Sequence, residues 1–416
     1  MAIVGQKYGS VFEIGKGGLR LLPGQDHLRH ADASSASLSA EAAEGADNRD
    51  LIDANTSQKL TDDDIKEMRS GGASGSEIIE ALVQNSDSWH TKTQFSQQKW
   101  LARKEQKYTP RLRLCRCDAA SVCEAYYQKH REKMCNLRSD SLAQILAFGN
   151  VYSGVQVTVF DTCMGLVVSS VLERLGGRGR VLAPYAGSHP AMDAIHKFNF
   201  SEAVHKIVHS FHTSEIGISQ NSGREEVDDS EEAIAARTQK MIEDIPAFAE
   251  KKLASLNTEA EKTAYMERRN ARIKKQCAKP QPATIRNWIR DKSDSLIIVT
   301  HFHPTSVLLN LLPTLAPSAP FVVFSEYIEP LVECFREVQK RCIACKLQLS
   351  NTWTREYQVL PGRTHPAMNM SACSGYILTG IKVQEREDGW QFVDKVQEKR
   401  KKAKVMRRAD GDGDNG

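Results

Sequence analysis

Short apolar runs alternate with amphipathic stretches from residue 155 to residue 383 of this chain. The apolar runs have the length of strands, and the stretches between them repeat apolar residues every three or four positions, as helices do. The pattern predicts strands at 155–160, 180–183, 205–211, 296–300, 321–325, 345–349 and 376–383, and helices at 165–175, 191–198, 304–312 and 329–341. This alternation predicts an α/β fold, a Rossmann-like, mostly parallel sheet covered by helices on both faces.

The first part of the chain has a different texture, and we expect it to form a smaller, β-rich domain over 1–135. Residues 8–22 carry short apolar runs broken by glycines, which is typical of strands and turns. Helices are predicted at 60–69, where Thr61 is a suitable N-cap, and at 76–84.

Three segments with biased composition fall outside these patterns. They are 31–57, rich in Ala, Ser and acids; about 214–290, an acidic and helical insertion in a sheet domain of 136–390; and 391–416, a basic tail. Within the insertion, 223–232 holds six acids among ten residues, which is typical of a solvated loop, and 245–275 predicts a long exposed helix. We expect 31–57 and the tail to be disordered, because neither can bury an apolar face.

Composition narrows the class of protein without deciding its function. The 416 residues are 26% charged and 40% hydrophobic, which is ordinary for a soluble globular protein. The net charge of +4 is small but unevenly distributed, so local basic patches decide which polyanions can bind. Ten scattered cysteines predict reduced thiols and an intracellular protein. We expect no signal peptide, and no apolar run is long enough to span a bilayer.

The first predicted strand of the sheet ends near Asp161, and the loop that follows lies where doubly wound domains bind a nucleotide-like cofactor. A working S-adenosylmethionine loop reads acid-x-Gly-x-Gly-x-Gly, because backbone must approach the cofactor closely. Here Cys163 and Val167 replace the first and third glycines and only Gly165 remains, while the second strand ends at 183–185 without a carboxylate for the ribose. We therefore expect this chain to bind no cofactor, with Cys163 and Val167 filling the space of the methyl donor. The alternatives are a plain loop acid at Asp161 or a cofactor in a degenerate pocket.

A basic segment over 95–118 is the strongest candidate for binding RNA. On a helix, Lys99, Arg103 and Lys107 lie at i, i+4 and i+8 and form one basic stripe. Between residues 99 and 116 the segment also contains Lys104, Arg111, Arg113 and Arg116 against the single acid Glu105, and Phe95, Trp100 and Tyr108 are candidates to stack on exposed bases. The alternative is a solvated helix face that Trp100 anchors in the core.

Two smaller groups are weaker candidates for function. Arg363 and His365 lie in a loop bounded by prolines, where Arg suits bidentate contact with phosphate and His can bond a base. The alternative is a local ion pair and a structural histidine. The His-x-His pair at 301–303 and the Cys-x-x-Cys pair at 342–345 each lack the third and fourth ligands of a structural zinc, so we expect no metal site.

Five short stretches, in a fixed order along the chain, carry the most specific signal. They are 95–100 (FSQQKW), 138–150 (RSDSLAQILAFGN), 302–305 (FHPT), 320–334, which includes PFVV and EPL, and 357–366 (YQVLPGRTHP), the last being the most specific. In these stretches the chain resembles the non-catalytic subunit family of the eukaryotic tRNA (adenine-N1)-methyltransferase, which modifies the T-loop adenosine at position 58. The likeness covers about residues 1–20 and 58–385, apart from the acidic insertion.

The resemblance implies a degenerate Rossmann-like methyltransferase domain preceded by a smaller β-barrel-like domain. It implies a catalytic partner that binds S-adenosylmethionine and carries the catalytic Asp at the end of the fourth strand. The matching position here is Thr300, so this chain is expected to have no catalytic residue. The resemblance also implies tRNA as a ligand, a heterotetramer of two catalytic and two non-catalytic subunits, and a location in the nucleus. The basic run 395–408 predicts a nuclear-import signal or an RNA-contacting arm, and the alternative is a solubilising disordered end. Because the apolar runs are short, we expect no membrane partner.

Two other functions stay open on sequence alone. One is an active tRNA methyltransferase with an unusual cofactor loop, since the strand, loop and helix order around Asp161 is retained. The other is a stand-alone RNA-binding translation factor, which the basic segments alone would support.

Overall fold

The structure is a computed structural model that describes residues 3–15, 18–22, 57–89, 93–255, 258–359 and 364–384. The chain divides into two compact units, which we describe separately. The N-terminal unit comprises Met1–Arg116 with Arg355–Met370, and the sheet unit comprises Cys117–Thr354 with Ser371–Gly416. Residues 355–370 are more than 200 positions from 1–116 in sequence, so domain boundaries drawn along the chain could not assign them to this unit.

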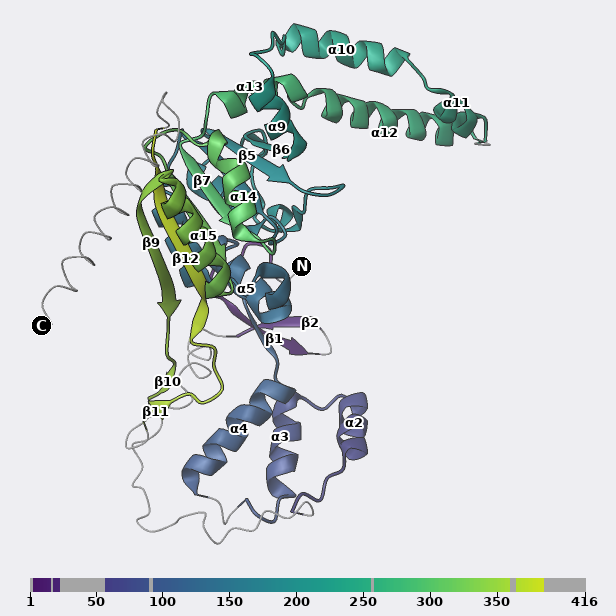
Figure 1. The fold of residues 1–416 in the computed structure, drawn as a ribbon. Helices are drawn as coiled ribbons and strands as arrows, with labels where there is room; N and C mark the ends of the chain where they lie inside the picture. The colour runs from purple at the N-terminus through teal and green to yellow at the C-terminus, as the bar shows by residue number, and fades with distance from the viewer. Residues whose placement is uncertain are drawn as a thin grey trace, which may run out of the picture. The chain divides into compact units, whose positions relative to one another are not determined.

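The sheet unit is built on a seven-stranded sheet in the order β6-β5-β4-β7-β8-β12-β9. Its strands are β4 (Gln156–Asp161), β5 (Arg180–Tyr185), β6 (Val208–His212), β7 (Ser295–Val299), β8 (Pro320–Ser325), β9 (Ala344–Trp353) and β12 (Cys373–Lys382). The first five pair in parallel, and β12 is antiparallel to both β8 and β9. The predicted α/β class with a mostly parallel, Rossmann-like sheet is confirmed (Figure 1).

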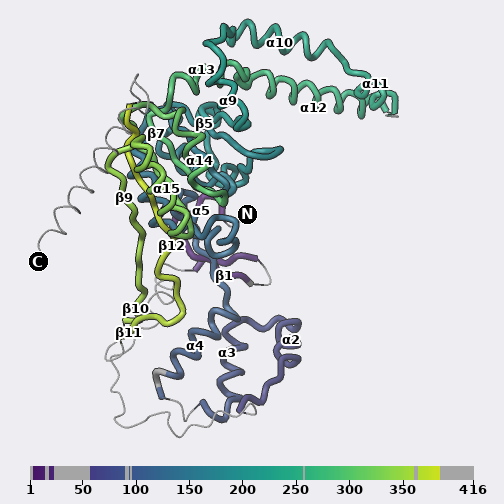
Figure 2. The backbone as a smooth tube through the Cα atoms, viewed as in Figure 1, coloured from purple at the N-terminus to yellow at the C-terminus, as the bar shows by residue number. Residues whose placement is uncertain are grey.

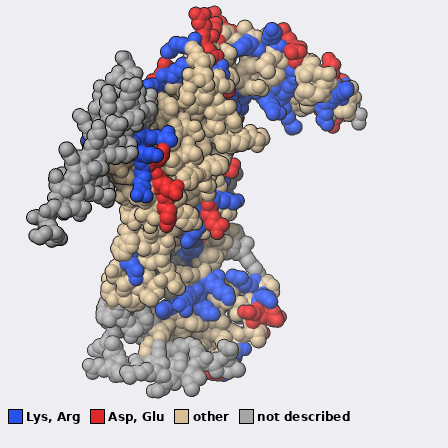
Figure 3. All heavy atoms as spheres, in the orientation of Figure 1, with Lys and Arg blue, Asp and Glu red and all other residues tan. Residues whose placement is uncertain are grey.

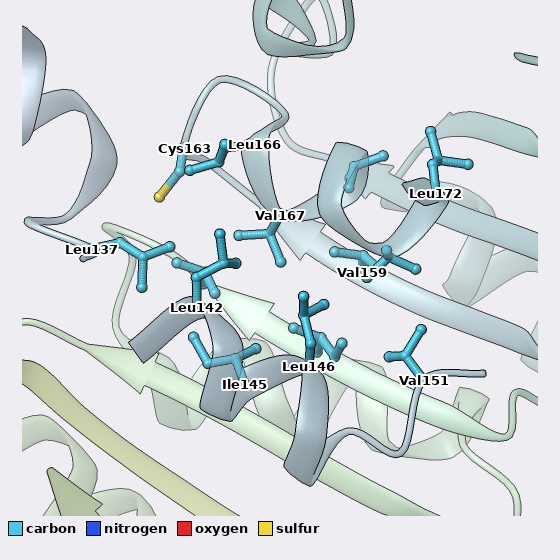
Figure 4. Packing of buried hydrophobic residues seen from close by; sticks show 14 of the residues in the cluster. Leu137, Leu142, Ile145, Leu146, Val151, Val159, Cys163, Leu166, Val167 and Leu172 are labelled. Atoms are coloured by element: carbon cyan, nitrogen blue, oxygen red, sulfur yellow. The ribbon is translucent and has the colours of Figure 1, made fainter. Parts of the chain in front are cut away.

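Helices cover both faces of this sheet because its central strands are apolar on both sides. All five residues of β7 are buried. On one face pack α5 (Ala119–His130), α6 (Ser139–Phe148) and α7 (Leu166–Leu175); on the other pack α9 (Ser214–Asn221), α13 (Pro282–Arg290), α14 (Pro304–Leu311) and α15 (Ile328–Arg341). Figure 4 shows the first face, where residues of α6 and α7 meet side chains of β4.

The helix predicted at 191–198 is wrong in type and extent. The chain forms only a short 3-10 helix at Asp193–Lys197, followed by α8 (Glu202–His205). The Ala194 N–H donates to the carbonyl of Met164 at 2.9 Å, so the segment is tied to the loop after β4. This tertiary tether competes with the helix that the local apolar spacing favours.

The insertion between β6 and β7 contains a helical arm, which we define as residues 231–277. It consists of α10 (Glu231–Glu243), α11 (Ala247–Ala254) and α12 (Glu259–Cys277), and the tube in Figure 2 shows α10 and α12 running alongside each other. The single long helix predicted at 245–275 is therefore wrong. Thr258 starts a new helix there, since its side chain and that of Glu261 form a reciprocal capping box.

The described part of the N-terminal unit holds a three-stranded antiparallel sheet and three helices. They are β1 (Val11–Gly15), β2 (Gly18–Leu21), β3 (Arg111–Arg113), α2 (Asp62–Gly71), α3 (Gly75–Gln84) and α4 (Gln94–Tyr108), with β10 (Tyr357–Gln358) and β11 (His365–Pro366) forming a separate ladder. Thr61 caps α2 as predicted. The β-barrel-like form of this domain stays a prediction.

None of the helices in the described part of the chain combines the length and apolar character that a membrane span requires. The predicted tail at 391–416, and all but the last residue of the predicted insertion at 31–57, lie outside the described residues.

Candidate cofactor loop and RNA interface

The loop after β4 directs its hydrogen bonds into its own chain. Asp161 is the last residue of β4, and its carboxylate accepts from the backbone N–H groups of Cys163 at 2.5 Å, Val167 at 2.8 Å and Val168 at 3.1 Å. Free N–H groups at a helix start are what usually bind an anionic cofactor in this fold. Two of those at the start of α7 are already used by Asp161. This acid is therefore more than a plain loop residue.

Burial sets the charge balance of this carboxylate. Desolvation raises the pKa of Asp161 to about 6, and the hydrogen bonds from the backbone N–H groups of Val168, Cys163 and Val167 oppose that rise. Burial therefore destabilises the ionised form of this carboxylate, and the N–H groups at the start of α7 stabilise it in part.

The side chains that replace the two glycines belong to the apolar core. Cys163 and Val167 are both completely buried, and they lie in one cluster with Leu137 and Leu142 (Figure 4). Removing either side chain would leave a cavity in that cluster. Both side chains are therefore part of the packing between α6, α7 and the sheet.

A second segment closes the side of the loop at Gly165, which has a φ of +80°. A Cβ at Gly165 would lie 2.9 Å from the Cα of Met192 and 3.1 Å from the carbonyl oxygen of Ala191. Contacts this short show that the chain already occupies the space beside the remaining glycine. Sequence analysis did not single out Ala191 or Met192.

The end of β5 offers no acid to a ribose. The strand ends Ala183-Pro184-Tyr185, where the Tyr185 carbonyl accepts from the N–H of Thr213 at 3.0 Å. The Tyr185 ring meets the ring of His212 edge-on, with centroids 5.8 Å apart. The rings of Tyr185 and His212 therefore lie at this strand end, where a cofactor-binding domain would have a carboxylate.

The end of β7 places a threonine and a histidine where the resemblance implies a catalytic acid in the partner. Thr300 is buried, and its hydroxyl oxygen accepts from the N–H of Phe302 at 3.0 Å. His301 contacts the Sγ of Cys135 at 3.4 Å and the hydroxyl of Thr162 at 2.9 Å. The bond to Cys135 raises the pKa of His301, which favours an imidazolium at neutral pH. Neither residue is a carboxylate.

The predicted basic stripe is real and lies on α4. Lys99, Arg103 and Lys107 are all exposed on this helix, and Figure 3 shows Lys and Arg side chains gathered over that part of the N-terminal unit. Lys104 is half-buried, and its ammonium lies 5.2 Å from the ring centroid of Trp100. All three cations of the stripe are exposed, although the ammonium of Lys107 also lies 5.2 Å from the ring centroid of Tyr108.

The aromatic residues of α4 are part of its anchor in the N-terminal unit. Tyr108 is buried in a cluster with Ile78 and Leu82, so its predicted stacking on RNA bases is wrong. The rings of Trp89 and Trp100 meet edge-on, with centroids 5.2 Å apart. This arrangement matches the alternative in which Trp100 anchors the helix.

The remaining candidates lie elsewhere in the N-terminal unit. Arg111 and Arg113 are on strand β3, half-buried and exposed respectively. His365 is exposed on β11, with its Nδ1 3.0 Å from the carbonyl oxygen of Pro366. Arg363 lies outside the described residues.

Comparison with known proteins assigns this architecture to a family. Residues 1–244 match the Gcd10p family. The chain belongs to the Gcd10p family. The assignment agrees with the resemblance seen in its five short stretches.

Relatives of this Gcd10p-family chain carry a consistent name. A mouse (Mus musculus) protein is 32% identical over 91% of this chain and 81% of its own length, and a Dictyostelium discoideum protein is 35% identical over 81% and 64%. Both are named tRNA (adenine(58)-N(1))-methyltransferase non-catalytic subunit TRM6. The tRNA (m1A58) methyltransferase TrmI of Aquifex aeolicus superposes with a TM-score of 0.34 and 14% identity over 59% of this chain and 68% of that one, which adds nothing to the assignment.

Proposed function

We propose that this Gcd10p-family chain is the non-catalytic subunit of a tRNA (adenine(58)-N(1))-methyltransferase, which binds tRNA and supports a catalytic subunit. The observation that carries the proposal is the closed strand end of β4. Asp161 engages the N–H groups of Val167 and Val168, and Ala191 with Met192 fills the space beside Gly165. A methyl donor would have to displace the chain's own backbone there.

The chemistry of methyl transfer supports the same division of labour. Methylation of adenine at N1 needs a base to take the proton from the exocyclic amino group. The Thr300 hydroxyl is a poor base at neutral pH and already accepts a hydrogen bond from Phe302. In this proposal the S-adenosylmethionine and the catalytic carboxylate come from the partner subunit, and the assembly holds two copies of each chain.

The contribution of this chain to the substrate is positive surface. The stripe of Lys99, Arg103 and Lys107 offers three solvated cations on one face of α4, and Arg113 adds a fourth in the same unit. Cations of this kind dominate affinity for RNA, because they release counter-ions from phosphates on binding. The affinity is therefore expected to fall steeply with salt.

Co-expression with a catalytic subunit tests the proposal. Each chain alone and the purified complex are assayed for methylation of tRNA, for S-adenosylmethionine binding by calorimetry, and for mass by light scattering. We expect methylation and cofactor binding only when the catalytic subunit is present, and a complex with two copies of each chain. Methylation by this chain alone would favour an active enzyme with an unusual loop. A well-folded monomer that binds RNA and ignores the catalytic subunit would favour a stand-alone factor.

We also propose that the basic tail directs the chain to the nucleus. Residues 395–408 hold eight basic residues and one acid, although they lie outside the described residues. A fluorescent fusion that lacks 391–416 is expected to lose nuclear enrichment. Unchanged enrichment would refute this role of the tail.

A further inference from the structure

The helical arm is anchored to the sheet unit by a built network of polar contacts. Arg286 of α13 pairs with Glu225 at 2.5 Å and Glu215 at 2.7 Å, and its side chain is only 16% exposed. Asp229, just before α10, accepts from Arg237 at 2.9 Å and also from Thr284. Partly buried ion pairs hold a fixed geometry better than exposed ones do. The base of the arm is therefore fixed in place.

The two long helices of the arm are also locked to each other. The guanidinium of Arg269 on α12 donates to the carbonyls of Met241 and Ile242 at 3.0 Å and of Asp244 at 2.7 Å, at the end of α10. Cys277 packs against Met241, with their sulfur atoms 3.4 Å apart. These contacts define the packed face of α12 and satisfy carbonyls that the end of α10 leaves free.

A neighbouring face of α12, together with the residues just after the helix, carries cations without local partners. Residues 268–279 contain six basic residues and no acid. Four of them, Arg268, Arg272, Lys275 and Lys279, are exposed and recur at the three- and four-residue spacing of one helix face. None of these four forms an ion pair or side-chain hydrogen bond with any residue that the structure describes. In Figure 3 the Lys and Arg side chains gather along the edge of the arm formed by α12.

Helix-end electrostatics do not account for this stripe. Cations stabilise a helix mainly when they lie in its last turn. Arg268 and Arg272 lie more than one turn before Cys277, the last residue of α12. Their charges need another explanation than the helix dipole.

A hollow of about 580 Å³ adjoins the same stripe. It lies between α12 and the turn from α10 to α11, and its lining includes Phe248, Tyr265, Arg268 and Arg272. The Phe248 side chain is 72% exposed, so its ring is accessible to a ligand at the hollow. Aromatic rings beside guanidinium groups form a surface on which an unstacked base can lie.

We propose that the arm is a second RNA-binding site, in which the cations of α12 follow phosphates and the hollow at Phe248 receives an unstacked base. The inference rests on the proposed function, which supplies a tRNA as the polyanion. From Arg268 to Lys275 the stripe spans about 10 Å at the helical rise, enough to contact neighbouring phosphates of one strand, and Lys279 follows just after the helix. An acidic peptide would match the charge but gives no reason for the exposed ring beside it.

Charge reversal on two faces of the same helix pair tests the site. In the full complex with a catalytic subunit, R268E/R272E changes the stripe, while K240E/K274E makes the same change of charge at exposed positions away from it. We expect the stripe variant to bind tRNA at least tenfold more weakly and with a shallower salt dependence, and the control to stay within twofold. The KM for tRNA should rise in parallel for the stripe variant alone.

A second variant probes the hollow without changing charge. Phe248→Ala is expected to weaken tRNA binding about fivefold or more, because stacking on an aromatic ring is lost. The helix content of every variant is compared by circular dichroism, so that loss of folding is recognised.

The outcomes separate the arm from the proposed function. Equal losses of tRNA affinity in R268E/R272E and K240E/K274E would mean that overall charge, and not this site, sets the affinity, and would overturn the proposal. Unchanged tRNA affinity in R268E/R272E, in a complex that methylates tRNA, would overturn it too. If R268E/R272E no longer assembles with the catalytic subunit but keeps its affinity for RNA, the surface is a protein-docking site, which would also overturn the proposal. If the wild-type complex neither binds nor methylates tRNA, it is the proposed function that fails.

Discussion

The end of β4 and the helix α4 are two regions with opposite treatment of polar groups. At the end of β4, the carboxylate of Asp161 is satisfied by the chain's own backbone, and Cys163 and Val167 are completely buried. On α4, Lys99 and Arg103 remain exposed to solvent. At the end of β4 the groups that could bind a ligand are bonded within the chain, whereas the cations of α4 remain available to one.

The contrast shows how a Rossmann-like domain can keep its fold without its cofactor site. Glycines next to a cofactor cost stability, since they add no packing and loosen the unfolded chain. Side chains such as Val167 replace ligand contacts by core contacts, so stability and loss of the site arise from the same atoms. A basic surface has no such alternative use, because its charges are best left in water until a polyanion arrives.

The largest effect is expected when the glycines are put back at the end of β4. C163G/V167G should lower the free energy of unfolding by about 3 to 5 kcal/mol, because two buried side chains are lost and glycine enters a helix. Urea unfolding followed by circular dichroism measures this loss. The variant should still show no heat of binding with S-adenosylmethionine, since Ala191 and Met192 remain beside Gly165.

Val332→Gly, on the partly exposed face of α15, is the matched control. It should cost no more than about 1 kcal/mol, from the small difference in helix propensity and the loss of a partly exposed side chain. Cofactor binding by C163G/V167G would contradict the view that the backbone at 191–192 closes the loop.

The next largest effect is expected on α4. K99E/R103E/K107E should weaken tRNA binding by on the order of 100-fold at moderate salt and lower the slope of log affinity against log salt by about 3, since three phosphate contacts are lost. Filter binding over a range of salt concentrations measures both quantities. Assembly with the catalytic subunit should not change.

A control with the same change of charge is K66E/K129E/K133E, at exposed positions outside α4. It should change tRNA affinity by less than about threefold. Equal losses in the two triple variants would remove the special role of the stripe.

A smaller effect is expected in the pH dependence of stability at Asp161. Burial raises the pKa of its carboxyl from 3.8 to about 6, so the folded protein holds this proton more tightly than the unfolded chain. The resulting stabilisation is complete below pH about 4 and is lost as pH rises through about 6. In Asp161→Asn this fall should be absent, a difference on the order of 1 to 3 kcal/mol between the two pH limits.

Asp140→Asn serves as a control, because the stability that Asp140 contributes changes with pH in the opposite direction. The hydrogen bond from Arg138 lowers the pKa of Asp140, so that its stabilisation is present at neutral pH and lost in acid. Urea unfolding at several pH values distinguishes the two variants. If the free energy of unfolding depends on pH in the same way for wild type and Asp161→Asn, the pKa of Asp161 is not raised by burial.

The smallest effect separates two lysines of α4. Lys104→Gln should lower the free energy of unfolding by about 0.5 to 1 kcal/mol, because its ammonium leaves the face of Trp100. Lys99→Gln should leave stability unchanged and weaken tRNA binding severalfold, since Lys99 is exposed. Thermal unfolding and RNA titration of both variants test this division. The reverse result would place Lys104 in the RNA interface and Lys99 in the packing.

Patterns within one element were sufficient to predict most of the fold. The alternation of apolar strands with helices predicted the parallel sheet, and the polar residue before an acidic first turn predicted the cap of Thr61 on α2. The spacing of Lys99, Arg103 and Lys107 predicted one exposed face of α4. These signals are local, because helix and strand periods repeat within a few residues.

Tertiary structure alone decided which groups meet. It placed Ala191 and Met192 beside Gly165, His301 against Cys135, and Tyr108 in the core. It also broke the predicted helix 245–275 and set α12 against α10 so that one face of α12 stays basic and open. Such contacts join residues far apart in sequence and depend on how whole elements pack, so no local period announces them.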